Sequence, residues 1–270
     1  MKPPIAYYGS KLSIASDIVR VLPAHDHYVE PYAGSLAVLL AKPRAKMETV
    51  NDLDGRLMSF WRVLRDRGDE LARACALTPH ARAELAAAHE PAADELEDAR
   101  RLWVLLTQSR TGTTRKVGWR QYVNPKGSGM GMPRYLSTYV DRIAPVVERL
   151  HDVSLEARPA LDIIASYGKH PGVLLYVDPP YFGARAKNYG LEQQGEQDHR
   201  ELAAALTAAR ASVVISGYDS PLYADLYAGW HRYEIHAHTT QGTGPSSRTE
   251  VLWSNRPLAS QEALFDGEVA

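Results

Sequence analysis

The sequence predicts a mixed α/β fold, because short apolar runs that end at acidic residues alternate with segments of helical periodicity. The clearest run, Val173–Val177, has the length and composition of a buried strand. It stops at Asp178, Pro179 and Pro180. Prolines cannot continue a sheet ladder, so the strand ends there and presents Asp178 at its carboxyl end. Open α/β sheets bind ligands at that edge.

Length and composition set the limits of the prediction. A chain of 270 residues can form one domain with an insertion or two small domains. The net charge of −1 does not by itself indicate a nucleic-acid binder, so local charge has to be considered. Cys75 is the only cysteine, which excludes an internal disulfide and a cysteine-rich zinc site.

The sequence predicts neither a metal site nor a membrane-spanning segment. The histidines occur singly, without the spacing of metal ligands, so we expect no metal site. No apolar segment is long enough to cross a membrane, and residues 1–11 lack the apolar core of a signal peptide. We therefore expect a cytoplasmic protein.

The first element in chain order is a turn at Gly9 and Ser10, after which Lys11 begins a predicted amphipathic helix with Leu12, Ile14 and Ile18. Two interpretations of Tyr7 stay open. It packs in the core before a capped helix, or it lies against a ligand ring while Lys11 contacts a carboxylate.

Residues 28–41 predict a strand, a small-residue turn and a helix. The strand holds Glu30, the turn holds Tyr32 and Gly34, and the helix runs over 36–41. In this arrangement backbone N–H groups and a helix start approach a ligand. The three-glycine spacing of the dinucleotide fingerprint is absent.

Residues 48–52 predict a second strand that ends in the acid Asp52. A carboxylate at this position can accept both ribose hydroxyls of a nucleotide, whereas the alternative is helix capping. We assign the cap to Asp54, which precedes an amphipathic helix carrying Leu57, Trp61 and Leu64.

Residues 65–150 predict several helices and little strand. No acidic residue occurs between Asp98 and Asp141, and the middle of this stretch, 111–133, is rich in Gly, Thr and Ser with Trp119 and Tyr122 interleaved. Its basic residues are Arg100, Arg101, Arg110, Arg115, Lys116, Arg120, Lys126 and Arg134. Such a loop suits phosphate contacts and wedging beside bases. We favour DNA contact over the alternative of an ordinary flexible surface loop.

The remaining elements follow the same alternation. A third strand is predicted over 153–156, and Asp162 at the next helix start is either an N-cap or a ligand contact. A helix beginning at Asp198, a buried strand over 212–216 and a final hairpin of 230–235 with 250–253 complete the pattern.

Residues 178–181 combine an acid, a fixed carbonyl and a flat ring, which suits an exocyclic amine on an aromatic base. The two amine N–H groups can bond to Asp178 and to the Pro179 carbonyl, while Tyr181 stacks on the ring. The alternative, a strand followed by a Pro-Pro turn with Asp178 as a turn residue, is equally open on these four residues alone.

The tetrapeptide Asp178-Pro179-Pro180-Tyr181 resembles the catalytic motif of amino-methyltransferases that use S-adenosylmethionine, and its Asp form looks like the N6-adenine DNA enzymes. Residues 7–11, 30–34, 52, 162 and 178–181 occur in the order of the DNA adenine methyltransferases of the Dam-like D12 class. Two departures occur: Ser35 and Leu36 follow Gly34 where the family repeats a glycine, and Ser10 stands where many relatives have one.

The resemblance implies a doubly wound S-adenosylmethionine-dependent methyltransferase fold, Rossmann-like with a mixed sheet, and an inserted helical target-recognition domain. The expected parts are 1–64 for cofactor binding, 65–150 for DNA recognition, 151–255 for catalysis, and a tail over 256–270.

The implied activity is methyl transfer from S-adenosylmethionine to N6 of an adenine flipped out of double-stranded DNA, in a bacterial or phage setting. The expected catalytic residues are Asp178, Pro179, Pro180 and Tyr181. The expected cofactor-binding residues are Tyr7, Lys11, Glu30, Tyr32, Gly34, Asp52, Asp162 and Asp178. The expected DNA-binding residues are Arg110, Arg115, Lys116, Arg120 and Lys126. Alternatives are transfer to cytosine N4 or RNA, and a catalytically silent DNA-binding relative.

The tail carries Gln261, Leu264 and Phe265, which resemble the Gln-x-x-Leu-Phe peptide that holds the replication sliding clamp. The two apolar side chains would fill a pocket and the glutamine would fix the register. The alternative is that Leu264 and Phe265 pack against their own domain.

Overall fold

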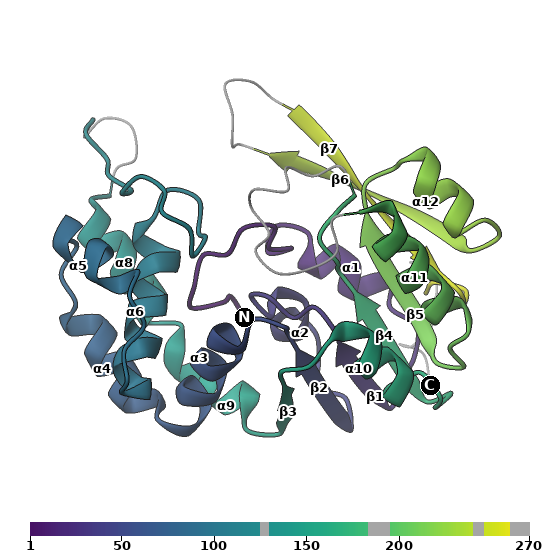
Figure 1. Ribbon diagram of the computed structural model, residues 1–270, viewed down its shortest axis with the longest axis horizontal. Helices are drawn as coiled ribbons and strands as arrows, with labels where there is room; N and C mark the ends of the chain where they lie inside the picture. Colours follow the sequence, from purple (N-terminus) through teal and green to yellow (C-terminus); the bar gives the residue numbers. More distant parts are fainter. Residues whose placement is uncertain (125–129, 183–194, 240–245, 260–270) are drawn as a thin grey trace, which may run out of the picture. The chain divides into compact units, whose positions relative to one another are not determined.

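A computed structural model of the protein describes residues 1–124, 130–182, 195–239 and 246–259 (Figure 1). The chain divides into two compact units. One unit comprises Met1–Leu12, Gly34–Leu40 and Asp54–Leu155, and the other comprises Ser13–Ala33, Ala41–Leu53 and Glu156–Ala270. We call the first the helical unit and the second the sheet unit.

Among the described residues the strands form one seven-stranded sheet in the order β3-β2-β1-β4-β5-β7-β6. The strands are β1 (His27–Glu30), β2 (Met47–Asn51), β3 (Val153–Glu156), β4 (Val173–Val177), β5 (Ser212–Gly217), β6 (His231–Thr239) and β7 (Ser246–Ser254). β1 is parallel to β2 and β4, and β4 is parallel to β5, while β7 is antiparallel to both β5 and β6. The mixed sheet of the prediction is therefore confirmed.

The order of the strands changes direction at β1. The chain moves outward from β1 to β2, returns to β4 on the other side of β1, and continues to β5. Val29 of β1 lies opposite Leu175 of β4. In open α/β sheets a crevice forms at the carboxyl ends of strands where the order reverses. The carboxyl ends of β1 and β4 form such a switch point.

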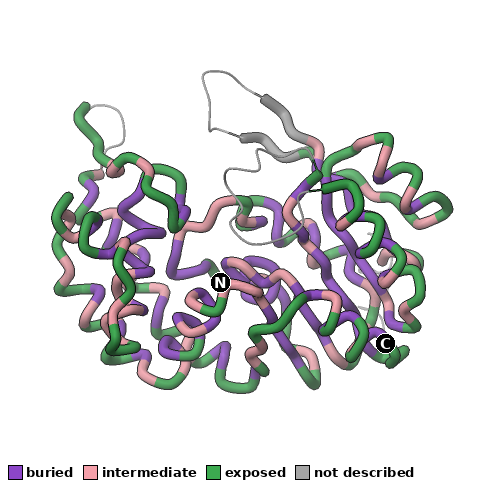
Figure 2. The backbone as a smooth tube through the Cα atoms, in the orientation of Figure 1, coloured by how far each residue is buried: buried purple, intermediate pink, exposed green. Residues whose placement is uncertain are grey.

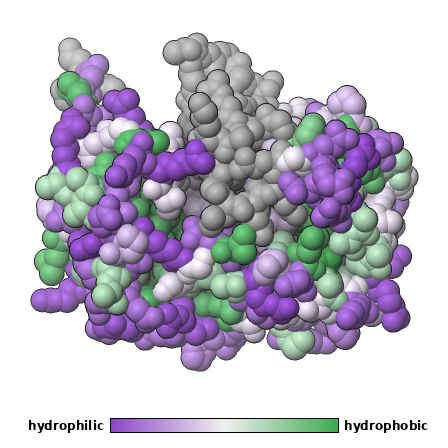
Figure 3. Space-filling model, viewed as in Figure 1, coloured by the Kyte–Doolittle hydropathy of each residue, from purple (hydrophilic) through white to green (hydrophobic). Residues whose placement is uncertain are grey.

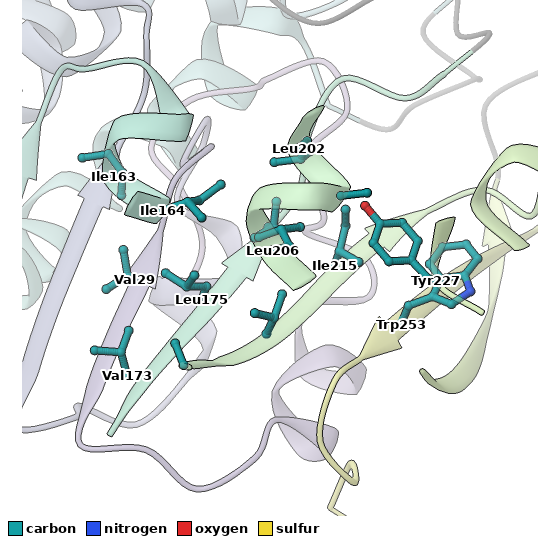
Figure 4. Close-up of a cluster of buried hydrophobic side chains, with 14 of the residues drawn as sticks. Val29, Ile163, Ile164, Val173, Leu175, Leu202, Leu206, Ile215, Tyr227 and Trp253 are labelled. Atoms are coloured by element: carbon teal, nitrogen blue, oxygen red, sulfur yellow. The ribbon is translucent and has the colours of Figure 1, made fainter. Parts of the chain in front are cut away.

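Helices in the sheet unit are α1 (Ala15–Val21), α10 (Ala160–Tyr167), α11 (Glu196–Thr207) and α12 (Pro221–Leu226). Figure 4 shows Ile163 and Ile164 of α10 and Leu202 and Leu206 of α11 directed at the strands. Their partners on the sheet include Val29, Leu175, Ile215 and Trp253. All five residues of β4 are buried, so both faces of this central strand are covered (Figure 2).

The helical unit contains α3 (Gly55–Asp66), α4 (Gly68–Leu77), α5 (Arg82–Ala88), α6 (Glu95–Gln108), α8 (Met132–Val140) and α9 (Ile143–Leu150), together with most of α2 (Ala37–Ala41). α6 packs against α3, α4 and α5. From Leu102 to Gln108 every residue of α6 is buried. A helix buried all round is the core of its unit.

Several helix boundaries differ from those predicted. The first helix begins at Ala15 and not at Lys11, because Ile14 has a non-helical φ of −123°. The second begins at Ala37, since Leu36 has a φ of +60°. The capping alternative for Asp162 is wrong, because Pro159 is the N-cap of α10. The Asp54 cap is confirmed, with its carboxylate accepting from the N–H groups of Arg56 and Leu57.

The visible surface is polar over most of its area, with smaller hydrophobic groups between (Figure 3). Among the described helices, none is long and apolar enough to cross a bilayer.

Candidate functional site

Three acidic residues mark the carboxyl ends of three adjacent parallel strands. Glu30 is the last residue of β1, Asp52 follows β2 directly, and Asp178 follows β4 directly. All three belong to the sheet unit. The sequence placed each acid at a strand end, and the strand order now shows that these ends are neighbours. They form one acidic edge beside the switch point.

A buried hydrogen-bond network holds Asp178. The Ser216 hydroxyl, at the carboxyl end of β5, donates to Asp178 Oδ1 at 3.0 Å. The Tyr176 hydroxyl of β4 lies 3.3 Å from Ser216 Oγ. Ser216 is fully buried, and the pKa of Tyr176 is well above its usual value, first through burial and then through the Asp178 charge. The Tyr176 hydroxyl therefore stays protonated near neutral pH.

Tyr181, at the other end of the motif, is held by β7. Its hydroxyl donates to the Glu250 carboxylate, and its ring meets that of Tyr218 edge-on with the centroids 4.6 Å apart. Both Tyr181 and Glu250 are buried. Burial raises the pKa of Tyr181 far above its usual value, and the charges of Asp178 and Glu250 raise it further. The phenol is thus a stable donor.

Ser216 and Glu250 did not emerge from the sequence as site residues. Ser216 ends an apolar run in the same way that Asp178 does, so the carboxyl-edge argument could have identified it. Glu250 carried no such signal, because its position follows from the place of β7 between β5 and β6 in the sheet.

The acids on β1 and β2 have different surroundings. Glu30 is 2% exposed and accepts a hydrogen bond of 2.5 Å from the Tyr28 hydroxyl. Asp52 is half-buried, and Asn51 before it is fully buried. The Asn51 side chain donates to the carbonyls of Pro31 and Arg158 at 2.9 and 3.0 Å. These bonds tie the segment after β1 to the loop before α10.

Two further predicted residues lie in the same unit. Tyr32, just after β1, is half-buried and packs against the hydrophobic cluster of Figure 4. Asp162 lies in the first turn of α10, where its carboxylate is 4.0 Å from Arg158 and its side chain is 57% exposed.

In the helical unit the structure brings together residues 7–11 and the turn at Gly34. Gly34 has a φ of +47°, and a Cβ added there would lie 3.1 Å from the Tyr7 ring. The hydroxyls of Ser10 and Ser35 are 2.7 Å apart, and Lys11 Nζ donates to the Gly9 carbonyl at 3.3 Å. The serines that depart from the family pattern thus bond to each other.

The segment that carries Arg110, Arg115 and Lys116, which we call the basic loop, contacts residues 6–8. Gly112 has a φ of +61°, and its carbonyl accepts from the Tyr8 N–H at 2.9 Å. A Cβ at Gly112 would lie 3.0 Å from the Ala6 carbonyl carbon. Only glycine suits both the left-handed backbone and this close approach. Arg110 and Gly112 therefore belong to a loop whose backbone packs on residues 6–8.

The base of that loop is closed by an aromatic stack. The Trp119 ring lies on His80, with centroids 4.2 Å apart, and the Arg82 guanidinium lies 4.5 Å from its centroid. The Arg110 N–H donates to the Gly118 carbonyl at 2.9 Å. Trp119 is half-buried, so it anchors the loop, whereas Tyr122 is 45% exposed.

The predicted basic residues separate into two groups. Arg110, Arg115 and Lys116 are exposed, and Arg120 is half-buried with its guanidinium 5.2 Å from the Tyr135 centroid. In contrast, Arg100 and Arg101 of α6 pair with Glu97, and Arg100 also pairs with Glu84. The latter group stabilises the helices. Lys126 lies outside the described residues, as do Gln261, Leu264 and Phe265.

A metal centre has no candidate in the part of the chain that the structure describes, where no group of three His, Cys, Asp or Glu side chains could hold an ion.

Comparison with known proteins gives a family match that covers most of the chain. Residues 7–241 match the family model of D12 class N6 adenine-specific DNA methyltransferases. The chain is 23% identical to the Type II methyltransferase M1.LlaDCHI of Lactococcus lactis subsp. cremoris, over 94% of this chain and 95% of that protein. It is 25% identical to the retron Ec67 DNA adenine methylase of Escherichia coli, over 93% and 90%.

Among solved structures, the rRNA methyltransferase aviRa of Streptomyces viridochromogenes overlaps with a TM-score of 0.38 and 15% identity, over 99% of this chain and 91% of that one. The fold assignment therefore rests on the strand order. The family match favours N6-adenine transfer over cytosine N4, RNA and a silent relative.

Proposed function

The chain belongs to the D12 class of N6 adenine-specific DNA methyltransferases, and we propose that residues 178–181 hold the target adenine while it receives a methyl group from S-adenosylmethionine. The observation that carries this proposal is the position of Asp178. It follows β4 directly at the switch point, with Ser216 fixing its carboxylate and Pro179 and Pro180 stiffening the next residues.

The donor set of the acidic edge fits S-adenosylmethionine. The half-buried Asp52 at the end of β2 can accept the ribose hydroxyls, and Asp162 lies in the first turn of α10, where the resemblance implies adenine contact. Glu30, the third acid of this edge, is buried. When bound, S-adenosylmethionine supplies an electrophilic methyl group on a good leaving group.

The residues of this chain position the nucleophile. The two N–H groups of adenine N6 donate to Asp178 and to the Pro179 carbonyl, which turns the nitrogen lone pair out of the ring plane and toward the methyl group. Fixing that geometry and stabilising the charge that develops on N6 lower the barrier. In this proposal Tyr181 borders the base, with its ring held by Glu250.

DNA binding is assigned to the basic loop of the helical unit and, more broadly, to residues 65–150. Arg110, Arg115 and Lys116 are exposed on a segment that Trp119 anchors, which suits contacts to phosphates. Tyr122 is the aromatic side chain exposed for contact with bases. We also retain sliding-clamp binding by Gln261, Leu264 and Phe265 as a proposal.

The test is Asp178→Ala in the full chain, with labelled methyl transfer to DNA as the measurement. We expect the rate to fall at least about a thousandfold, because both orientation and charge stabilisation at N6 are lost. The melting temperature should change little, since Asp178 is half-buried at a strand end. Near-normal transfer by a folded variant would refute the assignment.

A further inference from the structure

We propose that Ser216 and Glu250 are positioning residues that clamp the two ends of residues 178–181, Ser216 through the Asp178 carboxylate and Glu250 through the Tyr181 hydroxyl. This inference rests on the proposed role of residues 178–181. It adds two residues, from β5 and β7, that do not themselves belong to the motif.

The first half of the clamp has a defined donor order. An ionised carboxylate can only accept, so the single Ser216 proton goes to Asp178 Oδ1, at 3.0 Å. The Ser216 oxygen can then accept from Tyr176, whose hydroxyl is 3.3 Å away. All bonds run in one direction, from Tyr176 to Ser216 to Asp178. Such a chain polarises each donor in turn and fixes the rotation of the Asp178 carboxylate about its χ2 bond.

The carboxylate orientation matters because the substrate amine must meet it at hydrogen-bonding distance while its lone pair points elsewhere. A carboxylate that rotates freely would lose this alignment for much of the time. Strands hold Ser216 more precisely than a loop could, since it lies opposite Leu252 of β7 within a paired ladder.

The second half of the clamp fixes the ring of Tyr181. Glu250 is 6% exposed and lies opposite Ile235 of β6 in the ladder, so its carboxylate has little freedom. The Tyr181 hydroxyl donates to it, and Tyr218 closes one side of the ring. Rotation of Tyr181 is thereby restricted, and a flat ring in one orientation is what a stacked base requires.

The test compares kcat, KM for DNA and cofactor affinity in Ser216→Ala, Glu250→Ala and Glu250→Gln. Removal of either positioning contact should lower kcat about tenfold, because a small displacement of a reacting group costs this much or more. Cofactor affinity should change little, and kcat is compared well below the melting temperature of each variant, because truncation of a buried hydrogen-bonding side chain lowers that temperature. Glu250→Gln should retain most activity, since the amide oxygen still accepts from Tyr181.

Matched controls separate positioning from general damage. Ser254 of β7 is also fully buried, and its hydroxyl accepts a local bond of 3.2 Å from the Arg256 N–H. Ser254→Ala should therefore leave kcat unchanged. Tyr176→Phe should lower kcat by less than Ser216→Ala, because it removes only the outer donor. Tyr181→Phe combined with Glu250→Ala should be no worse than Glu250→Ala alone.

The experiment separates a failure of the clamp from a failure of the proposed role of residues 178–181. If Asp178→Ala is inactive while Ser216→Ala and Glu250→Ala keep full kcat, the clamp is wrong and the site stands. If Asp178→Ala is active, the site itself is wrong. A Glu250→Gln variant as slow as Glu250→Ala would also overturn the clamp, because the acceptor alone would then be insufficient.

Discussion

The acidic edge of the sheet unit and the loops of the helical unit are organised by different forces. At the edge, hydrogen bonds between side chains fix the site residues: the Ser216 hydroxyl donates to Asp178, and Glu250 accepts from the Tyr181 hydroxyl. In the helical unit, backbone shape dominates. Gly34 and Gly112 approach Tyr7 and Ala6 closely, and both have positive φ.

This difference decides what a substitution does. At the edge, a conservative exchange that keeps a donor or acceptor should preserve function. In the loops, the addition of a single Cβ should be harmful whatever its chemistry.

Substitutions at Leu36 test most directly whether backbone conformation limits the stability of the helical unit. It is fully buried and has a φ of +60°, the left-handed region, at the position where the family pattern has its last glycine. Leu36→Ala should lower the free energy of unfolding by about 3 kcal/mol through lost burial. Leu36→Gly should be about 1 kcal/mol more stable than Leu36→Ala, because glycine removes the backbone strain. Chemical denaturation measures both values.

Leu39 in α2 is the matched control for Leu36. It is equally buried but lies within the helix. There the order should reverse, with Leu39→Gly about 1 kcal/mol less stable than Leu39→Ala. The same order at both positions would mean that Leu36 is not strained.

The exposed charges of the basic loop should set the salt dependence of DNA binding. Arg115→Ala/Lys116→Ala should weaken binding roughly tenfold or more at low salt and reduce the slope of log K against log salt by about 2, since two fewer counterions are released. Titrations at several salt concentrations measure this. Arg62→Ala/Arg73→Ala removes the same charge from α3 and α4 and should leave the slope unchanged, and a slope that responds equally to both pairs would refute the loop assignment.

Trp119 should affect DNA binding without changing that slope. Its stack on His80 and Arg82 anchors the loop but places no charge on a phosphate. Trp119→Ala should weaken binding roughly fivefold, because the loop must then be ordered on binding. A flatter salt slope in Trp119→Ala would contradict a purely anchoring role.

Much of the sheet could be predicted from the sequence, because its strands are short apolar runs with clear ends. Val173–Val177 and Val153–Glu156 match the predicted bounds. The start of the first helix was misplaced, since Leu12 and Ile14 fit the helical period but no side chain caps the segment before Ala15. Periodicity alone does not show where the backbone turns.

The site was predicted in part for the same reason. Acids at strand ends are visible in a sequence, whereas partners such as Ser216 and Glu250 depend on which strands are adjacent. The bond between Ser10 and Ser35 joins residues far apart in the chain, and no local pattern indicates it. Residue types identify candidates, and topology decides which of them meet.

The smallest expected effect concerns Glu97, which pairs with Arg100 and Arg101 within α6. Arg100 and Arg101 bind Glu97 and hold its pKa down at about 2. Since the folded pKa is depressed, the stabilisation is fully present above the unfolded pKa near 4.3 and is lost as pH falls from there toward 2. Glu97 is 35% exposed in its side chain, so solvent screening reduces the effect. Glu97→Gln should therefore cost about 1 kcal/mol at pH 7 and much less at pH 2.5. Denaturation at the two pH values measures this, and an equal cost at both would show that hydrogen bonds and not charge hold the arginines.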